Sequence, residues 1–385
     1  MNSMDTYIIK FESNVFIEKQ MLIPISLSEH DIVSCENIEY GTGEFPGGLL
    51  EMESEQRKKP LTLGDLSFEM VDNILTKLHS LELFSCYGVS TGIRRIVKRN
   101  LHLPNTLGIY LSDKMCIVFA EGKYVKYTKD ARRCAYGYGT YETKYVNFMD
   151  LPSESNERVG FLEDVNYAEA GLNVFLAVLT TPEVHLKELR IHLKEDYKSS
   201  KFIATFKNTL ISSKVQLDVT TLHLIDMNPK QIMRILPYLK PTTLKKIRID
   251  SGYGDYDKEN MRELTRTEHW KQAEKIEVCF PSLIPIKKLL HLREFSISRH
   301  KMTAREIANI KNHMFKHKNI DKVELLIYDE DFDVGIARRV LGPYIPNPDD
   351  PNTRYYQGAN EAISVEMIED YDDCCTCVVM TRMVE

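Results

Sequence analysis

The residues best placed to do chemistry on their own lie near the carboxyl end of the chain. Asp372 and Asp373 precede three closely spaced thiols, those of Cys374, Cys375 and Cys377. Thiolates are the usual ligands of a structural zinc ion, but adjacent thiols fit one tetrahedral ion poorly and no second ligand cluster accompanies them. We therefore expect the chain to bind no metal and no cofactor. A site for a soft metal ion at these thiols is the alternative.

Motifs of the common catalytic sites are missing from the sequence. It contains no H-E-x-x-H, G-x-S-x-G, Walker-type loop or paired C-x-x-C sites. The Gly/Tyr-rich segment 136–141 suggests a nucleotide loop, but it lacks a third glycine and a strand-loop-helix context, so we expect an ordinary loop. We expect no enzyme, although distant residues could still assemble an active site.

The basic run 311–318 is the one stretch that suggests an anion site. On a helix its charges would form the solvated face opposite Ile307, Ile310 and Met314, which is the simpler interpretation. Phosphate binding remains the alternative. Trp270, the only tryptophan, is expected to pack in the core.

Composition limits the class of protein. With 385 residues and 43% apolar residues, the chain can form two or three folding units, and its net charge of −6 is spread too evenly for nucleic-acid binding. The eight cysteines show no paired spacing, and we expect no secretory signal. The apolar stretch 171–179 falls short of the roughly 20 residues that span a bilayer. We therefore expect a cytoplasmic or nuclear protein that does not enter a membrane.

Residues 60–100 have the pattern of three short helices. In the first, the apolar side chains cover about 200° of the helix circumference at 100° per residue, twice the stripe of an ordinary surface helix. They are Leu66, Phe68, Met70, Val71, Ile74, Leu75 and Leu78. A unit of this size cannot easily stand alone. We expect another protein or the following domain to cover the apolar surface that remains exposed on this helix.

Two kinds of β-structure are predicted downstream. Residues 107–111, 116–120 and 124–127 are β-branched or aromatic runs, which predict a small antiparallel sheet. From residue 186 onward the pattern h-x-x-h-x-h, typical of leucine-rich-repeat strands, recurs six times. The anchors are Leu186/Leu189/Ile191, Val219/Leu222/Leu224, Leu244/Ile247/Ile249, Ala273/Ile276/Val278, Leu292/Phe295/Ile297 and Ile320/Val323/Leu325.

Helical patterns alternate with these strands, at residues 202–210, 230–239, 261–272 and 303–315, and Pro237 should kink or end the second. We therefore predict an α/β fold in which three short helices precede an irregular leucine-rich-repeat-like βα solenoid, with a small antiparallel β segment between them. Unequal repeat spacing and missing turn asparagines leave an ordinary α/β sheet as the alternative.

Side chains between the anchors should point to the concave face of such a solenoid. Those that we expect to bind a target protein are Glu188, Arg190, His192, His223, Lys246, Arg248, Lys275, Glu277, Glu294 and Ser296. Their mixed charge suits a folded protein or peptide better than an apolar small molecule. A solvated face without a ligand is the alternative.

Two family resemblances give these units a role. The run Leu66-Ser67-Phe68-Glu69, with Ile74-Leu75, Leu78, Leu81, Val89 and the segment 94–97, resembles the F-box, although Ser67 and Ile93 replace the usual proline and tryptophan. The segments LKELRI (186–191), ILPYLKPTTLKKI (235–247), HWKQA (269–273) and LLHL (289–292) resemble the FTH domain that accompanies F-boxes in a large nematode family.

The resemblance implies a non-catalytic subunit of a ubiquitin ligase, an adaptor in an SCF-type complex. The F-box would bind a Skp-type adaptor protein, and through it a cullin, by Leu66, Ser67, Glu69, Ile74, Leu75, Leu78, Leu81 and Val89. We assign residues 1–59 no role, 60–100 to the F-box, 104–345 to the target-binding domain and 346–385 to a C-terminal tail. The alternative is a scaffold whose F-box-like helices only cap the solenoid.

Overall fold

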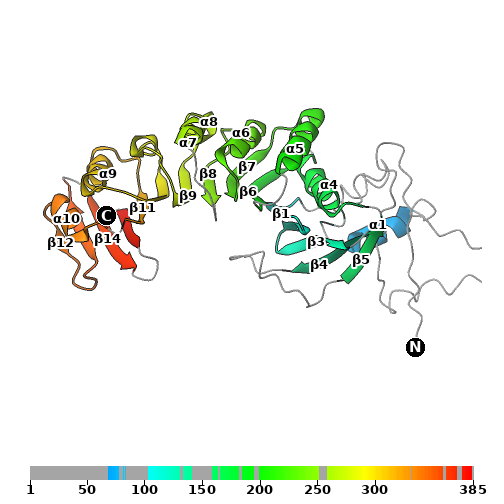
Figure 1. Cartoon of the computed structure of the whole chain (residues 1–385), viewed down its shortest axis with the longest axis horizontal. Coiled ribbons are helices and arrows are strands. Elements are labelled where there is room, and N and C mark those ends of the chain that lie inside the picture. The colour runs from blue at the N-terminus through cyan, green and yellow to red at the C-terminus, as the bar shows by residue number, and fades with distance from the viewer. Residues whose placement is uncertain are drawn as a thin grey trace, which may run out of the picture.

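A computed structural model describes most of the chain beyond residue 102 and a short part before it. The described residues are 68–77, 81, 83, 103–130, 133–140, 158–163, 165–181, 184–194, 199–250, 258–329, 331–358, 361–370 and 375–383. Within them the molecule is elongated, with one continuous sheet and a row of helices along one side of it (Figure 1).

The sheet begins with antiparallel strands, as the sequence predicts. They are β1 Thr106–Leu111, β2 Met115–Ala120, β3 Lys123–Asp130, β4 Arg133–Thr140 and β5 Arg158–Glu163. The tight turn between β2 and β3 places Glu121 and Gly122 at positive φ. The loop expected at 136–141 is wrong, because residues 136–140 belong to β4, where all five pair with β3 and residues 136–138 also pair with β5. Tyrosine is frequent in strands, so the alternating tyrosines of this segment favour a strand, whereas the glycines between them suggested a loop.

The middle of the sheet is parallel and is built from six successive strands. They are β6 His185–Leu193, β7 Asp218–Ile225, β8 Lys246–Asp250, β9 Lys275–Pro281, β10 Glu294–Arg299 and β11 Lys322–Ile327. Each pairs with the next in chain order. Strand β1 joins this part by pairing in parallel with β6. The antiparallel segment is therefore a continuation of the same sheet.

The C-terminal residues close the other end of the sheet. They form β12 Ile345–Pro346, β13 Thr353–Gln357, β14 Ala362–Asp370 and β15 Cys375–Met383. Strand β15 lies antiparallel between β11 and β14, so the order at this end is β12-β13-β14-β15-β11. Strands β13, β14 and β15 thus make the described residues of the segment 346–385, which the sequence analysis assigned to a C-terminal tail, a continuation of the sheet.

The helices follow the strands that they connect. They are α1 Phe68–Lys77, α4 Tyr167–Leu179, α5 Ser199–Ser213, α6 Pro229–Ile235, α7 Lys258–Leu264, α8 Glu268–Gln272, α9 Ala304–Lys316 and α10 Val334–Val340. Short 3₁₀ turns occupy Leu236–Tyr238 and Ile286–Lys288. None of the described helices is long and apolar enough to cross a membrane.

Local sequence explains where these helices begin and end. Asn228 and Thr303 cap α6 and α9 through reciprocal capping boxes with Gln231 and Glu306. Helix α6 ends at Ile235, two residues before Pro237, which opens the 3₁₀ turn as the missing N–H requires. The single helix expected at 261–272 is instead two short helices, α7 and α8, because the Thr267 side chain caps a new start.

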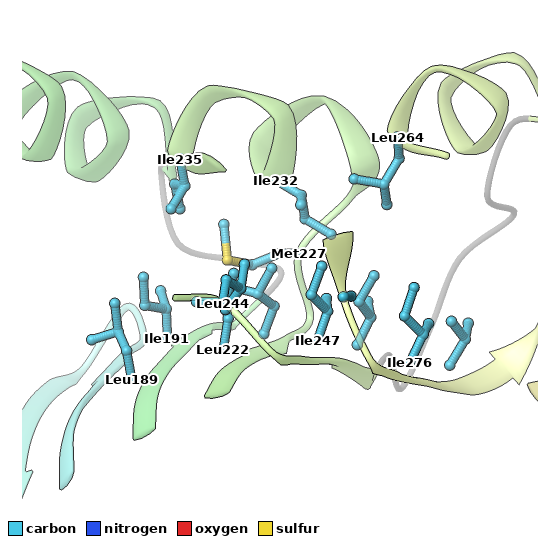
Figure 2. Close-up of a cluster of buried hydrophobic side chains, with 14 of the residues drawn as sticks. Leu189, Ile191, Leu222, Met227, Ile232, Ile235, Leu244, Ile247, Leu264 and Ile276 are labelled. Atoms are coloured by element: carbon cyan, nitrogen blue, oxygen red, sulfur yellow. The ribbon is translucent and has the colours of Figure 1, made fainter. Parts of the chain in front are cut away.

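The core lies between the sheet and the row of helices. The repeat anchors of β6 to β11 are all buried there, at no more than 5% exposure. Figure 2 shows Leu189, Leu222 and Ile247 pointing from the strands toward Ile232 and Ile235 of the helix layer. Trp270 packs in this layer as expected, fully buried, and its indole N–H donates to the carbonyl of Lys288 at 3.1 Å.

Helix α4, which contains the apolar stretch 171–179, covers the antiparallel end of the sheet against β1, β2 and β3. Its approach to β2 is so close that a Cβ on Gly171 would lie 2.1 Å from Sγ and 3.0 Å from Cβ of Cys116. Glycine at this position is therefore a packing requirement.

Replacing Gly171 with alanine tests this close approach. In an open helix the change would stabilise by about 1 kcal/mol, but the clash with Cys116 should reverse the sign and lower the free energy of unfolding by about 1–3 kcal/mol. Urea titration followed by circular dichroism measures it. Asn173→Ala, on the exposed side of α4, is the control and should stabilise. Adding Cys116→Ala should restore part of the loss, and a stabilised Gly171→Ala would contradict the packing.

Candidate protein-interaction face

The polar side chains of the parallel strands form two rows across the sheet. One row joins Glu188, Thr221, Lys246, Lys275, Glu294 and Lys322, and the other joins Arg190, His223, Arg248, Glu277, Ser296 and Glu324. Since side chains alternate along a strand, both rows point away from the buried anchors. None of the described helices lies over this face of β6 to β11 (Figure 1).

All ten residues predicted to bind a target lie on this face, which we call the charged face. Nine belong to the two rows, and His192 lies one alternation further along β6, opposite Ile225 of β7. The alternation rule placed these residues together without knowledge of the pairing, because the anchors identify each strand's buried side. That any of them binds a protein stays a prediction.

A connected chain of ion pairs runs across the charged face. His223 is 2.8 Å from Asp250 through Nε2 and 3.9 Å from Glu188 through Nδ1. Arg248 pairs with Asp250 at 3.0 Å and approaches Glu277 at 3.7 Å. The chain therefore couples strands β6, β7, β8 and β9 through side chains as well as through the backbone.

The chain continues to β10 through two lysines. Glu277 accepts from Lys246 at 2.8 Å and from Lys275 at 3.2 Å, and Lys275 also reaches Glu294 at 2.7 Å. With the pair Arg190 and Glu188 at its other end, the network joins four carboxylates to four permanent cations. Its charge sums to zero when His223 is neutral, so the face offers oriented polar groups and little net field.

Burial and pairing act in opposite directions on the acids of this network. Partial burial alone would raise the pKa of Asp250, but hydrogen bonds from His223, Arg248 and Cys279 hold it well below its usual range. Burial likewise opposes ionisation of Glu277, yet Lys246 and Lys275 lower its pKa. Both carboxylates are therefore charged at neutral pH and depend on their partners for it.

Cys279 is the nucleophile closest to these groups. Desolvation and the neighbouring Asp250 carboxylate raise the pKa of its thiol to about 12. A thiol with that pKa stays protonated at neutral pH and is a poor nucleophile. Although Cys279, His223 and Asp250 are neighbours, their electrostatics do not prepare the cysteine for attack.

Some residues of the charged face were not in the predicted set. Asp226, just after β7 and at positive φ, accepts from His192 at 2.9 Å. Tyr110 of β1 meets the same imidazole edge to face, with ring centroids 4.7 Å apart. Asp226 was missed because it lies in a turn, outside the strand repeat. Tyr110 was missed because β1 does not have the repeat pattern. The one sequence signal for the buried side of β1 is the alternation of Leu107, Ile109 and Leu111.

The structure describes part of the region expected to bind an adaptor. Leu66, Ser67, Leu78 and Val89 lie outside the described residues, Ile74 and Leu75 lie in α1, and Glu69 is exposed in its first turn. Leu81 is fully buried and belongs to the main core cluster. Leu81 therefore packs internally in the described structure, and its assignment as an adaptor contact stays a prediction. The remaining helices expected at 60–100 cannot be compared, because they fall outside the described ranges.

Side chains that bind metals do not gather in the part of the chain that the structure describes. Within those residues, no group of three or more His, Cys, Asp or Glu side chains could hold an ion. Of the three thiols near the C-terminus, Cys375 and Cys377 are described, and both belong to strand β15.

Comparison with known proteins adds two findings. Residues 200–343 match the model of the FTH domain. A curated relative, F-box A protein 224 of Caenorhabditis elegans, is 22% identical over 338 residues, which cover 85% of this chain and 82% of the relative. No solved structure matches the chain. Together the matches confirm the resemblance to F-box proteins with an FTH domain.

Asp250→Asn tests the charged network through its pH dependence. Because the folded pKa is lowered, the stabilisation is complete above the unfolded pKa of about 3.9 and is lost as pH falls below it. The variant should therefore be less stable than the parent by about 1–3 kcal/mol at pH 7, and the difference should shrink between about pH 4 and pH 2. Urea titrations at several pH values measure it.

Glu274→Gln is the matched control, since Glu274 forms an exposed ion pair with Lys245 at 2.9 Å and exposed pairs contribute below about 1 kcal/mol. A stability difference for Asp250→Asn that stays constant through the acid range would contradict the lowered pKa.

Proposed function

We propose that the chain is a substrate-recognition adaptor of an SCF-type cullin ubiquitin ligase. The observation that supports this most directly is the FTH match over 200–343, in a chain whose curated relative is named as an F-box protein. In this proposal residues 60–100 are the F-box and bind a Skp-type adaptor protein. The chain catalyses nothing itself; a separate enzyme transfers ubiquitin to the bound target.

The target binds the charged face in this proposal. Six parallel strands paired in chain order, with their connecting helices on one side, support the view that β6 to β11 form an irregular leucine-rich-repeat-like solenoid. The face opposite the helices presents oriented charges on a firm backbone, which favours recognition of a protein by complementary polar groups. Such recognition needs a large, well-packed interface of about 1,600 Å² in total.

Ubiquitin transfer then depends on proximity. The adaptor complex would hold the target near the transferring enzyme, and the raised local concentration would replace any chemistry by this chain. Ligases of this kind work in the cytoplasm or nucleus, and we propose the same location here.

One observation favours a second candidate function. Leu81 lies in the same buried core cluster as the sheet, as it would if the N-terminal helices only capped the end of a protein-interaction scaffold. Under that alternative the chain binds partners through the charged face but never meets a cullin complex.

Co-expression of the full chain with a Skp-type adaptor protein separates the two functions. We expect a stoichiometric complex in size-exclusion chromatography. Ile74→Asp combined with Leu75→Asp should weaken the complex by about a hundredfold or more, because a buried carboxylate at an apolar interface is costly.

Asn73→Asp is the matched control, since it adds one charge at an exposed position of the same helix. It should leave binding unchanged. Thermal melting of each variant checks that the sheet domain still folds. Separate elution of two folded proteins with the parent chain would reject the ligase adaptor and favour the scaffold.

A further inference from the structure

Three cations at the C-terminal end of the sheet have no carboxylate partner. They are Lys311 of α9, Arg338 of α10 and Arg354 of β13, and no ion pair of the described residues includes them. On the charged face every cation of the network meets an acid. Although acids outnumber bases in the sequence of this region, no ion pair of the described residues offsets the charge of these three side chains.

The three cations converge on two tyrosines. The Lys311 ammonium lies 4.7 Å from the ring centre of Tyr356, and the Arg354 guanidinium lies 3.9 Å from that of Tyr344. The two rings are 6.3 Å apart. Burial raises the pKa of Tyr356, and the positive charges of Arg354 and Arg338 oppose that rise. We call these five residues the terminal cluster.

Several polar atoms of the terminal cluster are buried without a partner. Tyr356 is 2% exposed, and its hydroxyl has no hydrogen-bond partner in the described structure. The same holds for the Nε atoms of Arg338 and Arg354. Burial also lowers the pKa of Lys311, as expected for a cation without an acid beside it. Unpaired buried polar groups are costly and call for an explanation.

Apolar side chains are exposed on the segments that carry the cluster. Ile336 and Val340, one turn apart on α10, are 45% and 46% exposed, and Tyr344 and Ile345 are 42% and 48% exposed. Large apolar side chains gathered at a surface, together with arginine and tyrosine, are typical of protein-binding surfaces. The cluster and these residues lie at the end of the molecule farthest from α1 (Figure 1).

The nearby sheet edge cannot supply the contact through its backbone. Strand β12 is the last strand of the sheet at this end, and it contains Pro346 between Pro343 and Pro348. Proline at an edge removes the donors that an added strand would need. A partner must therefore be held by side chains, which favours the cations and apolar groups just described.

We propose that the terminal cluster binds a phosphorylated segment of a protein partner. Lys311 donates to the carbonyl of Leu341, but none of the three cations takes part in an ion pair of the described residues. A phosphate monoester carries about −1.5 to −2 charges at neutral pH and three acceptor oxygens, which matches three such cations better than the single charge of a carboxylate. Arginine forks suit phosphate oxygens, and the exposed Tyr344 and Ile345 would receive aliphatic neighbours of the phosphorylated residue. This site does not depend on whether the chain docks on a Skp-type adaptor.

Fluorescence anisotropy with the full chain tests the site. The probes are a labelled Leu-Leu-phosphoserine-Leu-Leu peptide and its serine and glutamate counterparts. The phosphorylated peptide should bind about tenfold or more tighter than the serine peptide, with the glutamate peptide between them, and added salt should weaken it. Arg338→Gln and Arg354→Gln should each lose about tenfold in affinity for the phosphorylated peptide.

Arg339→Gln is the matched control, because Arg339 is the next residue of α10, carries the same charge and is exposed. It should change affinity less than about twofold. An equal loss in Arg339→Gln and Arg338→Gln would overturn the site, since general charge would then explain binding. Equal affinity of the parent for the phosphorylated and serine peptides would overturn it too, and equal affinity for the glutamate peptide would overturn phosphate in favour of a carboxylate.

Melting curves show whether the arginine variants fold. If they do not, the three-peptide comparison on the parent chain still decides. Binding of Arg338→Gln to a Skp-type adaptor should be unchanged, so failure at the terminal cluster and failure of the adaptor role can be told apart.

Discussion

The parallel register of β6 to β11 is the constraint on which the rest of the structure depends. Each strand pairs with the next residue for residue along most of its length, so that Leu189, Leu222 and Ile247 form one buried line. Because successive side chains alternate, the same register aligns the polar positions on the opposite face. A slip of one residue in a single strand would bury its charges and expose its anchors. Core and charged face are therefore two consequences of one pairing.

That coupling explains which parts of the molecule the sequence could predict. The anchors of the six parallel strands and the residues between them were placed correctly, because a period of two with branched residues carries the information locally. Helix starts at Asn228 and Thr303 were also readable, since the capping groups are neighbours in sequence. The pairing of β11 with β15 could not be predicted, because it joins segments far apart in the chain.

The C-terminal strands show this limit most clearly. Strand β15 inserts between β11 and β14, and its Arg382 ties the end of α9 by donating to the carbonyls of Met314, His317 and Ile320. A single arginine near the end of an apolar strand gives no local sign of such a role. Strand β4 was missed for a different reason. The glycines between its tyrosines are as typical of loops as of closely packed strands. Tertiary pairing decided both cases.

The two charged regions differ in how their charge is balanced, and the difference follows from their positions in the sheet. In the middle of the sheet charged residues lie opposite and beside one another, so Glu277 meets Lys246 of the neighbouring β8 and Lys275 of its own strand β9. Near the end of the sheet, Arg354 of β13 lies opposite the uncharged Pro346 of β12 and Val365 of β14, and it stacks on Tyr344 instead of meeting an acid. A stack on an aromatic ring holds a guanidinium in place without cancelling its charge. The edge is thus where this fold can retain an unbalanced, oriented positive charge, and an anion from outside the chain is the group that completes it.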